Sequence, residues 1–203
     1  LGPNNLISGK APSPRAYMSF VKSENHVYIF GGYSAADLND LYKFDAVNLT
    51  WTSLTTFVRG PSPPVRDSYG FGEYNGKLYL FGGYSNTACL NDLFLLDLAS
   101  LTWIDATPAT ALAPRPPPRL GMGFIRFGLL FFAFGGNDAD GYPMGDLWYL
   151  DPDKLLWTNL TDSASGDVPS PRAGSGMAEA GGAIYVHGGP EAPGGFSDQL
   201  FLF

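Results

Sequence analysis

Short apolar stretches alternate with polar, glycine-rich turns along the whole chain, and they recur in a constant order. Four of these stretches end in a glycine pair, at Gly31-Gly32, Gly82-Gly83, Gly135-Gly136 and Gly188-Gly189, so the pattern repeats every 51 to 53 residues. The stretches are rich in aromatic and branched residues, which is typical of strands. A period of this length without helical segments predicts stacked β units, each too small to bury its own apolar face.

Each repeat is expected to form four short antiparallel strands, a to d. In the first repeat we expect them at residues 16–21, 26–30, 41–44 and 50–54, and in the second at 69–73, 77–81, 93–96 and 102–105. In the third and fourth repeats we expect strands at 129–134, 147–150, 184–187 and 200–203. Strand b is almost entirely apolar, which predicts burial on both faces and the innermost place in the blade. Asn75-Gly76 is a strong hairpin signal, because both residues tolerate positive φ.

Two further residue types keep the same period and have a structural interpretation. The arginines are Arg15, Arg66, Arg119 and Arg172, and the tryptophans of strand d are Trp51, Trp103 and Trp157. We expect each arginine to bond loop carbonyls of adjacent blades through its fork of five donors, although a ring of arginines could also bind an anion. The tryptophans suit the wedge between blades, where the indole N–H is expected to find a carbonyl, and the glycine pairs allow backbones to approach closely.

An acidic residue, leucine and an aromatic residue precede each tryptophan in the complete repeats. These segments are Asn39-Asp40-Leu41-Tyr42, Asn91-Asp92-Leu93-Phe94 and Gly145-Asp146-Leu147-Trp148, with the diverged Asp198-Gln199-Leu200-Phe201 in the fourth repeat. Asp40, Asp92 and Asp146 are expected to be the structural acids that match the arginines, capping turns within the blade. Together with the proline-arginine step and the glycine pair, this order resembles kelch repeats over essentially the whole chain. The resemblance implies an all-β, kelch-type β-propeller, commonly a platform that binds other proteins and occasionally an enzyme.

We expect residues 1–203 to form a single repeat array with units at about 14–59, 64–112, 118–162 and 171–203, and residues 1–13 as the tail of a preceding unit. Phe203 aligns with Phe44, Leu96 and Leu150, each of which is followed by Asp and then Trp six residues later. This alignment predicts four four-stranded antiparallel blades, the last without its outer strand. The chain is therefore interpreted as part of a longer propeller, closed by further kelch repeats of the same chain or of another subunit.

Composition and charge narrow the possible partners. The net charge is −7 and no cluster of Lys or Arg occurs, so neither nucleic acid nor an anionic membrane surface is an expected partner. The longest apolar run, residues 127–134, is too short to span a bilayer. A single cysteine, Cys89, favours a reducing, cytoplasmic compartment. Two glycosylation sequons, at Asn48 and Asn159, leave secretion open.

Candidate catalytic and metal-binding residues are sparse. The two histidines, His26 and His187, fall at opposite ends of strand b and hence on opposite faces, so they cannot share a metal. Cys89 is expected in the b–c loop of the second repeat and has no histidine nearby in that repeat. Residues 137–141 lack the acidic spacing of an EF-hand and are interpreted as a solvated loop rather than a weak cation site. We therefore expect no catalytic residue, no metal and no cofactor.

The b–c and d–a connections should emerge together on one face, with tight turns on the other, and variable loops carry specificity in repeat arrays. The candidate contacts on this face are Tyr33, Asp37, Phe57, Arg59, Tyr84, Asn86, Arg115, Asn137, Asp138, Asp140, Tyr142, Glu191 and Phe196. Tyr33 and Tyr84 follow glycine pairs and are the strongest candidates, unless each ring folds over its own loop. The leading hypothesis is a non-catalytic protein-binding platform. The alternatives are a kelch-type enzyme or small-ligand binder that uses the central depression, and a structural subunit of a larger assembly.

Overall fold

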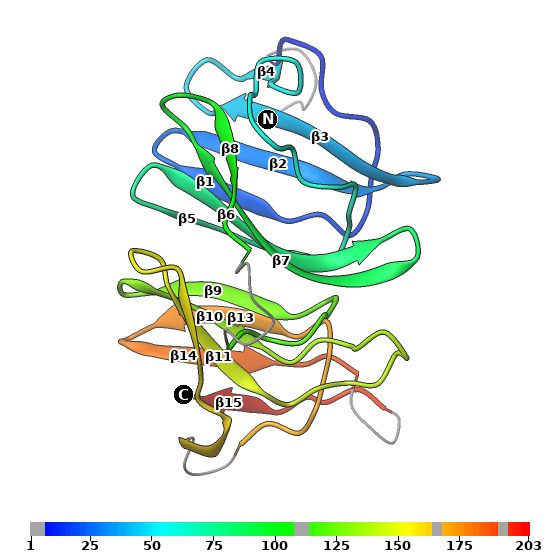
Figure 1. Ribbon diagram of the computed structural model, residues 1–203, viewed down its shortest axis with the longest axis vertical. Helices are drawn as coiled ribbons and strands as arrows, with labels where there is room; N and C mark the ends of the chain where they lie inside the picture. Colours follow the sequence, from blue (N-terminus) through cyan, green and yellow to red (C-terminus); the bar gives the residue numbers. More distant parts are fainter. Residues whose placement is uncertain (1–6, 108–113, 164–167, 191–194) are drawn as a thin grey trace.

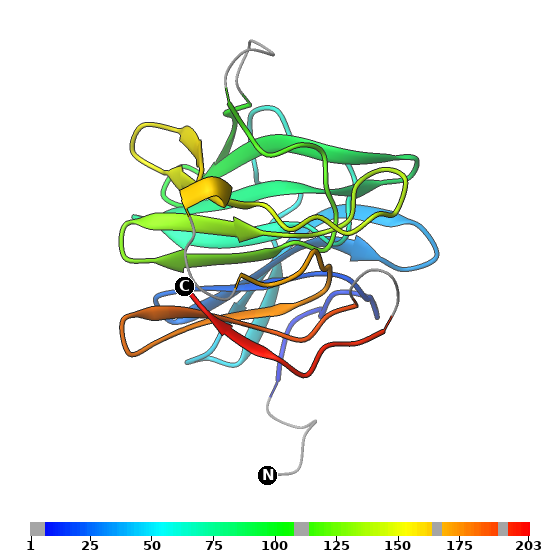
Figure 2. The same cartoon turned by 90° about the horizontal axis from the view of Figure 1, so that it is seen from below.

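The computed structural model describes residues 7–107, 114–163, 168–190 and 195–203, which form four antiparallel sheets arranged as blades (Figure 1, Figure 2). The first blade comprises β1 (Phe20–Ser23), β2 (His26–Tyr33), β3 (Asp37–Asp45) and β4 (Thr50–Ser53). The second comprises β5 (Gly70–Tyr74), β6 (Lys77–Ser85), β7 (Ala88–Asp97) and β8 (Thr102–Asp105). The third comprises β9 (Gly123–Phe127), β10 (Leu130–Phe134), β11 (Leu147–Asp151) and β12 (Leu156–Asn159), followed by the 3-10 helix η1 (Thr161–Ser163). The fourth comprises β13 (Gly176–Ala180), β14 (Ala183–His187) and β15 (Leu200–Leu202), so the predicted propeller with a three-stranded last blade is confirmed.

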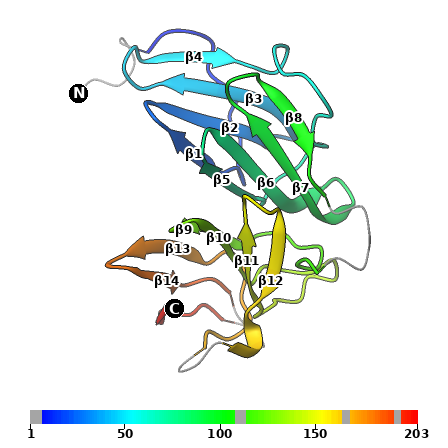
Figure 3. The same ribbon diagram turned by 60° about the vertical axis from the view of Figure 1, so that its left-hand side comes forward.

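Within each blade the strands follow chain order, so each strand pairs with the next (Figure 3). The first strands of successive blades, β1, β5, β9 and β13, pack side by side. Residues of β1, β5 and β9 also line a cavity of about 280 Å³. The prediction that strand b would be innermost is therefore wrong, because strand a lies at the axis. Strand b is instead the most deeply buried element, since it has a paired strand on both sides and blades on its faces.

The glycine pair closes strand b where backbones of neighbouring blades meet. Gly31 has a φ of 55°, and a Cβ there would lie 2.6 Å from the carbonyl oxygen of Leu38 and 2.7 Å from that of Arg66. The register between β2 and β3 shifts at this point, between Phe30 and Gly32. A left-handed backbone in such close contact is accessible at low cost only to glycine.

Tryptophan side chains of strand d wedge between neighbouring blades. Trp103 on β8 is buried, and its ring centroid lies 5.4 Å from that of Phe30 in the first blade. Trp157 on β12 lies 4.6 Å from Phe81 in the second blade. The expected carbonyl partner for the indole is not found at Trp157, because its Nε1 is buried without a hydrogen-bond partner in the described part of the chain.

The b–c connections of the first two blades are not the long loops that the sequence suggested. β2 and β3 continue past the glycine pair until Tyr33 lies opposite Asp37, and β6 and β7 continue until Ser85 lies opposite Ala88. Cys89, expected in a loop, therefore lies on β7. These hairpins project to the right in Figure 1. A long connection is present in the third blade, over residues 135–146. No described helix has the length and apolarity to cross a membrane.

Candidate protein-binding face

The b–c connections and the segments leading into strand a emerge at the same end of the propeller, which we call the loop face. Four buried arginines form its base. In the second blade, Nη1 and Nη2 of Arg66 donate to the two carboxylate oxygens of Asp92, each at 2.7 Å. Nη1 also donates to the Gly82 carbonyl at 2.9 Å, and Nε donates to the Pro64 carbonyl at 3.3 Å. The planar guanidinium thus joins two loops of its own blade through a bidentate ion pair.

The same ion pair recurs in the first and third blades. Arg119 donates to Asp146 at 2.8 and 2.6 Å, and Arg15 donates to Asp40 at 2.5 and 2.9 Å. Burial of the Asp146 carboxyl raises its pKa, but the hydrogen bonds and charge of Arg119 and a bond from Trp148 lower the pKa below its usual value. These acids were expected to be the structural acids that match the arginines and to cap turns within the blade. They accept hydrogen bonds from the arginine side chains.

The arginine backbone reaches the preceding blade. The N–H of Arg66 donates to the Leu38 carbonyl at 2.9 Å, and the Arg66 carbonyl accepts from the N–H of Gly32 at 2.9 Å. Arg119 and Arg172 make the corresponding backbone bonds with the second and third blades. Each of these arginines therefore links two blades, one through its backbone and the next through its side chain. Because the donors of Arg66 bond to the protein itself, this geometry favours a structural role over anion binding.

Two residues after each arginine, the backbone turns through a left-handed conformation. The φ values are 56° at Tyr17, 52° at Ser68, 63° at Gly121 and 60° at Gly174. Backbone bonds link these positions around the axis: Ser68 N–H to Tyr17 carbonyl at 2.7 Å, Gly121 to Ser68 at 2.8 Å, and Gly174 to Gly121 at 2.8 Å. Tyr17 is the bulky exception in this series, and it is 67% exposed. A bulky residue at positive φ is uncommon and strained.

Tyr17 directly follows Ala16, which pairs with Tyr33 at the loop face. Tyr33 exchanges two backbone bonds with Ala16, both at 2.9 Å, and its side chain is 44% exposed. The ring therefore does not fold fully over its own hairpin. Tyr84, in the same position of the second blade, pairs with the backbone of Asp67 and is half-buried. We refer to Tyr17 and Tyr33 as the tyrosine pair.

A depression of about 360 Å³ lies at the axis next to the tyrosine pair. It is lined by Tyr17, Met18, Ser68, Met122 and Ser175, among others. Four blades contribute to this lining, so the axial depression depends on their assembly. The lining residues are mainly apolar and hydroxyl groups, which can contact a ligand but contain no histidine or carboxylate for proton transfer.

Two buried carboxyl groups connect the first and second blades at the loop face. Asp37 on β3 and Asp67, which precedes β5, are each 9% exposed and hydrogen-bond to each other. Asp37 also accepts a bond from the backbone N–H of Asn86 at the tip of the second hairpin. Burial raises the pKa of Asp67, and the negative charge of Asp37 raises it further. The tips of two hairpins are thus joined through a pair of acids.

The b–c loop of the third blade is organised by its own aspartate. Oδ1 of Asp138 accepts the N–H of Asp140 at 3.0 Å and that of Tyr142 at 2.9 Å. Such Asx turns order a loop without a cation. In the described ranges no group of three or more His, Cys, Asp or Glu side chains could hold a metal ion. Burial raises the pKa of the Cys89 thiol, and the charge of Asp138 adds to this, which makes the thiol a poor nucleophile.

The predicted contact residues differ in their exposure. The exposed ones are Tyr33, Phe57, Arg59, Asn86, Asp140, Tyr142 and Phe196. Those of intermediate exposure are Tyr84, Arg115, Asn137 and Asp138, while Asp37 is buried and Glu191 lies outside the described residues. Tyr17 was missed, although its sequence position two residues after the arginine, where the other repeats carry Ser or Gly, was a usable signal. His26 and His187 lie at opposite ends of their strands.

The fold and the repeated arginine and glycine motif define a β-propeller built from tandem repeats. A family model described as the KLHDC2/KLHL20/DRC7 Kelch-repeats domain matches residues 4–189. The chain therefore belongs to the kelch-repeat family.

Similar segments occur in much larger proteins. The chain is 33% identical over 152 residues to the Rho GTPase-activating protein gacHH of Dictyostelium discoideum, covering 72% of this chain and 10% of that protein. It is 31% identical to the flagellar outer arm dynein alpha chain of Chlamydomonas reinhardtii, covering 81% of this chain and 4% of the dynein. It is 32% identical to human host cell factor 1, covering 90% of this chain and 10% of that protein. The chain thus spans a tenth or less of the length of these relatives.

Proposed function

We propose that this protein is a non-catalytic kelch propeller that binds another protein through the loop face, with the tyrosine pair at the centre of the contact. The observation that carries this proposal is that Tyr17 has a positive φ and is exposed. An L-residue in the left-handed region costs about 1–2 kcal/mol. The equivalent positions show that Ser68, Gly121 and Gly174 suffice for the fold. A strained and exposed aromatic residue where a glycine serves elsewhere supports a role in contact with a partner.

The surroundings of the tyrosine pair support the same proposal. Further exposed aromatic side chains occur on the connections of the third and fourth blades, where Tyr142 is 69% and Phe196 is 87% exposed. Aromatic residues are enriched in protein interfaces because they combine large area with few rotatable bonds. The relatives carry this module within proteins with different names: a Rho GTPase-activating protein, a dynein alpha chain and a host cell factor. A module shared so widely is more consistent with binding than with one particular reaction.

The sequence is also compatible with two other functions. A kelch-type enzyme or small-ligand binder would use the axial depression, and a structural subunit would use only the blade edges. The residues that line the depression include no Asp, Glu, His, Lys, Arg or Cys side chain that could serve as a general acid or base. This composition favours the binding module over the enzyme. A structural subunit would not require the strain at Tyr17.

Site-specific photo-crosslinking tests the proposal. Benzoylphenylalanine is introduced in place of Tyr33, or in place of Leu129, an exposed apolar residue in the a–b turn of the third blade at the opposite end. Both proteins are irradiated in a lysate of the source organism. We expect discrete protein adducts from position 33, lost when Tyr17→Gly is added, and none from position 129. Equal adducts from both positions, or adducts unaffected by Tyr17→Gly, would contradict the proposal.

A further inference from the structure

Charged side chains are distributed unevenly between the two ends of the propeller. At the loop face, three of the repeated arginines are balanced by bidentate ion pairs with Asp40, Asp92 and Asp146. The described acids that remain on this face are Asp37, Asp67, Asp138, Asp140 and Asp198, and the bases beside them are Arg115 and Arg172. Other described bases lie on or beside the a–b and c–d turns at the opposite end, namely Lys22, Lys77, Arg126 and Lys154. The described part of the loop face therefore carries an excess of negative charge.

The buried acids Asp37 and Asp67 lie next to the tyrosine pair. Asp37 is opposite Tyr33 in the ladder of β2 and β3. Asp67 immediately precedes Ser68, whose N–H donates to the Tyr17 carbonyl at 2.7 Å. Neither acid forms an ion pair with a base in the described ranges. Even when two carboxyl groups share one proton, the pair keeps one negative charge, which attracts a cation that comes close to it.

The axial depression beside these residues has a lining that suits a long basic side chain. Met18 and Met122 supply apolar surface, against which the methylene stem of such a side chain can pack. Hydroxyl groups come from Ser19, Ser68 and Ser175, and a hydroxyl oxygen can accept a hydrogen bond from an ammonium or guanidinium group. The Ser175 hydroxyl is buried and has no hydrogen-bond partner among the described residues. It therefore keeps its capacity to accept a bond from a ligand.

No residue that lines the depression carries a charge that would repel a base. Burial raises the pKa of Tyr69 in the lining, and the guanidinium groups of Arg15 and Arg66 oppose that shift. Each of these arginines is balanced by its bidentate bond with the aspartate of its own blade. The exposed ring of Tyr17 can attract a cation to its face. The charge, the hydroxyl groups and the aromatic ring thus all favour a positively charged occupant.

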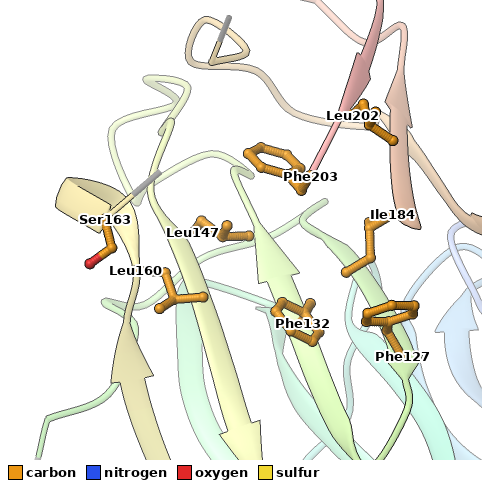
Figure 4. Close-up of a pocket in the computed structure, with 8 residues that line it drawn as sticks. All are labelled: Phe127, Phe132, Leu147, Leu160, Ser163, Ile184, Leu202 and Phe203. Carbon is orange, nitrogen blue, oxygen red and sulfur yellow. The ribbon is translucent and has the colours of Figure 1, made fainter. Parts of the chain in front are cut away.

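A second cavity, between the third and fourth blades, does not have these features. Its volume is about 410 Å³, and of the eight residues that line it seven are apolar (Figure 4). Ser163 is the polar one. A charged side chain would lose its hydration there without gaining a partner of opposite charge. The axial depression is therefore the better site for a cation.

We propose that the axial depression receives a lysine or arginine side chain of the partner that binds the loop face. The stem of this side chain packs on Met18 and Met122, and its charged group meets the serine hydroxyls and the negative charge of Asp37 and Asp67. The partner therefore presents a basic segment. This inference rests on the proposed function of the loop face, because it specifies the chemistry of the ligand that this face binds.

Peptide display tests the chemistry of the ligand. Random short peptides on phage are selected on the 203-residue chain and counter-selected on its Tyr17→Gly variant, so that the retained peptides depend on the loop face. We expect these peptides to share a Lys or Arg. Replacing that residue by norleucine in the synthetic peptide keeps an apolar stem but removes the charge, and should weaken binding at least about tenfold. Retained peptides without a shared basic residue, equal binding of the norleucine peptide, or failure to retain any peptide would overturn the proposal.

Matched protein variants locate the bound peptide. Ser175→Lys places a base in the depression and should abolish binding, whereas Ser53→Lys makes the same replacement at an exposed residue of β4 and should leave binding unchanged. Unchanged binding to Ser175→Lys would place the peptide elsewhere and overturn the proposal.

The double replacement of Asp37→Asn and Asp67→Asn removes the negative charge beside the depression. It should weaken binding of the selected peptide about tenfold or more. Asp97→Asn, at the c–d turn of the second blade, should leave binding unchanged. Unfolding midpoints show whether each variant is folded, and if the double variant is not, Ser175→Lys decides. Equal binding to a folded double variant and to Asp97→Asn would overturn the role of the acid pair.

The basic ligand and the proposed function of the loop face fail separately. Photo-crosslinked adducts at position 33 that depend on Tyr17, together with retained peptides that lack a basic residue, would overturn the basic ligand alone. The absence of both adducts and retained peptides would overturn the two together.

Discussion

The carboxyl groups of Asp37 and Asp67 lie together between the first two blades and hydrogen-bond to each other, although both are largely buried. The repeat does not require an acid at the second of these positions, because the other blades carry Ala16, Leu120 and Ala173 there. Two buried carboxylates repel each other, so the pair is stable when it holds a proton. The link between the two hairpin tips should therefore depend on pH.

Asp67→Asn should raise the stability of the protein at neutral pH. Burial and the charge of Asp37 raise the pKa of Asp67 above its unfolded value of about 3.9. The resulting stabilisation is present below that unfolded value and is lost as pH rises through the higher folded pKa. The asparagine cannot ionise, so its advantage should appear at pH 7 and vanish below about pH 4. Urea unfolding at several pH values measures this difference.

Asp97→Asn is a control of opposite sign. Hydrogen bonds from Ser100 lower the pKa of Asp97, so its contribution to stability is present above the unfolded pKa and is lost as pH falls through the folded one. This variant should be less stable than the wild type at pH 7. An Asp67→Asn variant that is destabilised at pH 7 as well would contradict the assignment of a raised pKa to Asp67.

Tyr17→Gly should separate stability from binding. Glycine adopts the φ of 56° without the clash of a Cβ, so the free energy of unfolding should stay the same or rise by up to about 1 kcal/mol. Binding of a loop-face partner should fall at least about tenfold if Tyr17 anchors it. Thermal unfolding and a pull-down with the captured partner measure the two effects. A large loss of stability would show that the Tyr17 ring holds the fold.

Arg66→Lys should destabilise the propeller by about 2–3 kcal/mol, even though it keeps the charge. A lysine cannot reproduce the bidentate bond to Asp92 together with the bonds to Gly82 and Pro64 in a site without solvent. The same change at the exposed Arg126 should alter stability by less than about 0.5 kcal/mol. Denaturant midpoints provide the comparison, and equal effects at both sites would rule out a special structural role for Arg66.

Gly31→Ala and Gly128→Ala form a matched pair. Both glycines have similar positive φ, 55° and 59°, but only Gly31 has backbone oxygens within 3 Å of an added Cβ. Gly128→Ala should cost about 1 kcal/mol for backbone strain alone, whereas Gly31→Ala should cost about 1–3 kcal/mol more for the steric conflict. The difference in free energy of unfolding isolates the close approach of the blades. Equal costs would mean that φ alone explains the glycine at position 31.

Much of the fold could be predicted because each repeat carries its own evidence of structure. The turn at Asn75-Gly76 has positive φ at both residues, 51° and 73°, as its sequence indicates. The strand boundaries were less accurate. β1 begins at Phe20 rather than residue 16, because Ala16 and Tyr17 pair with Tyr33 and with the second blade before the regular strand begins. Local propensity does not contain such contacts.

The candidate site was predicted only in part, for the same reason. Tyr33 was recognised from its position after a glycine pair, but Asp37 was expected at the surface and is buried by Asn86 and Asp67 of the next blade. Tyr17 was overlooked because neither its φ nor its exposure can be derived from one repeat. The hairpin extensions of β2 and β6 also depend on a register shift at the glycine pair.

The sequence by itself determined the repeat, its strand order and the fold, because periodic apolar strands, glycine pairs and arginines are local features that each blade repeats. The tertiary structure alone decided which residues meet across blades. It brought Asp37 to Asp67 and paired Tyr33 with Ala16, the neighbour of Tyr17. These relationships join residues far apart in the chain, and only the packing of whole blades fixes their distances.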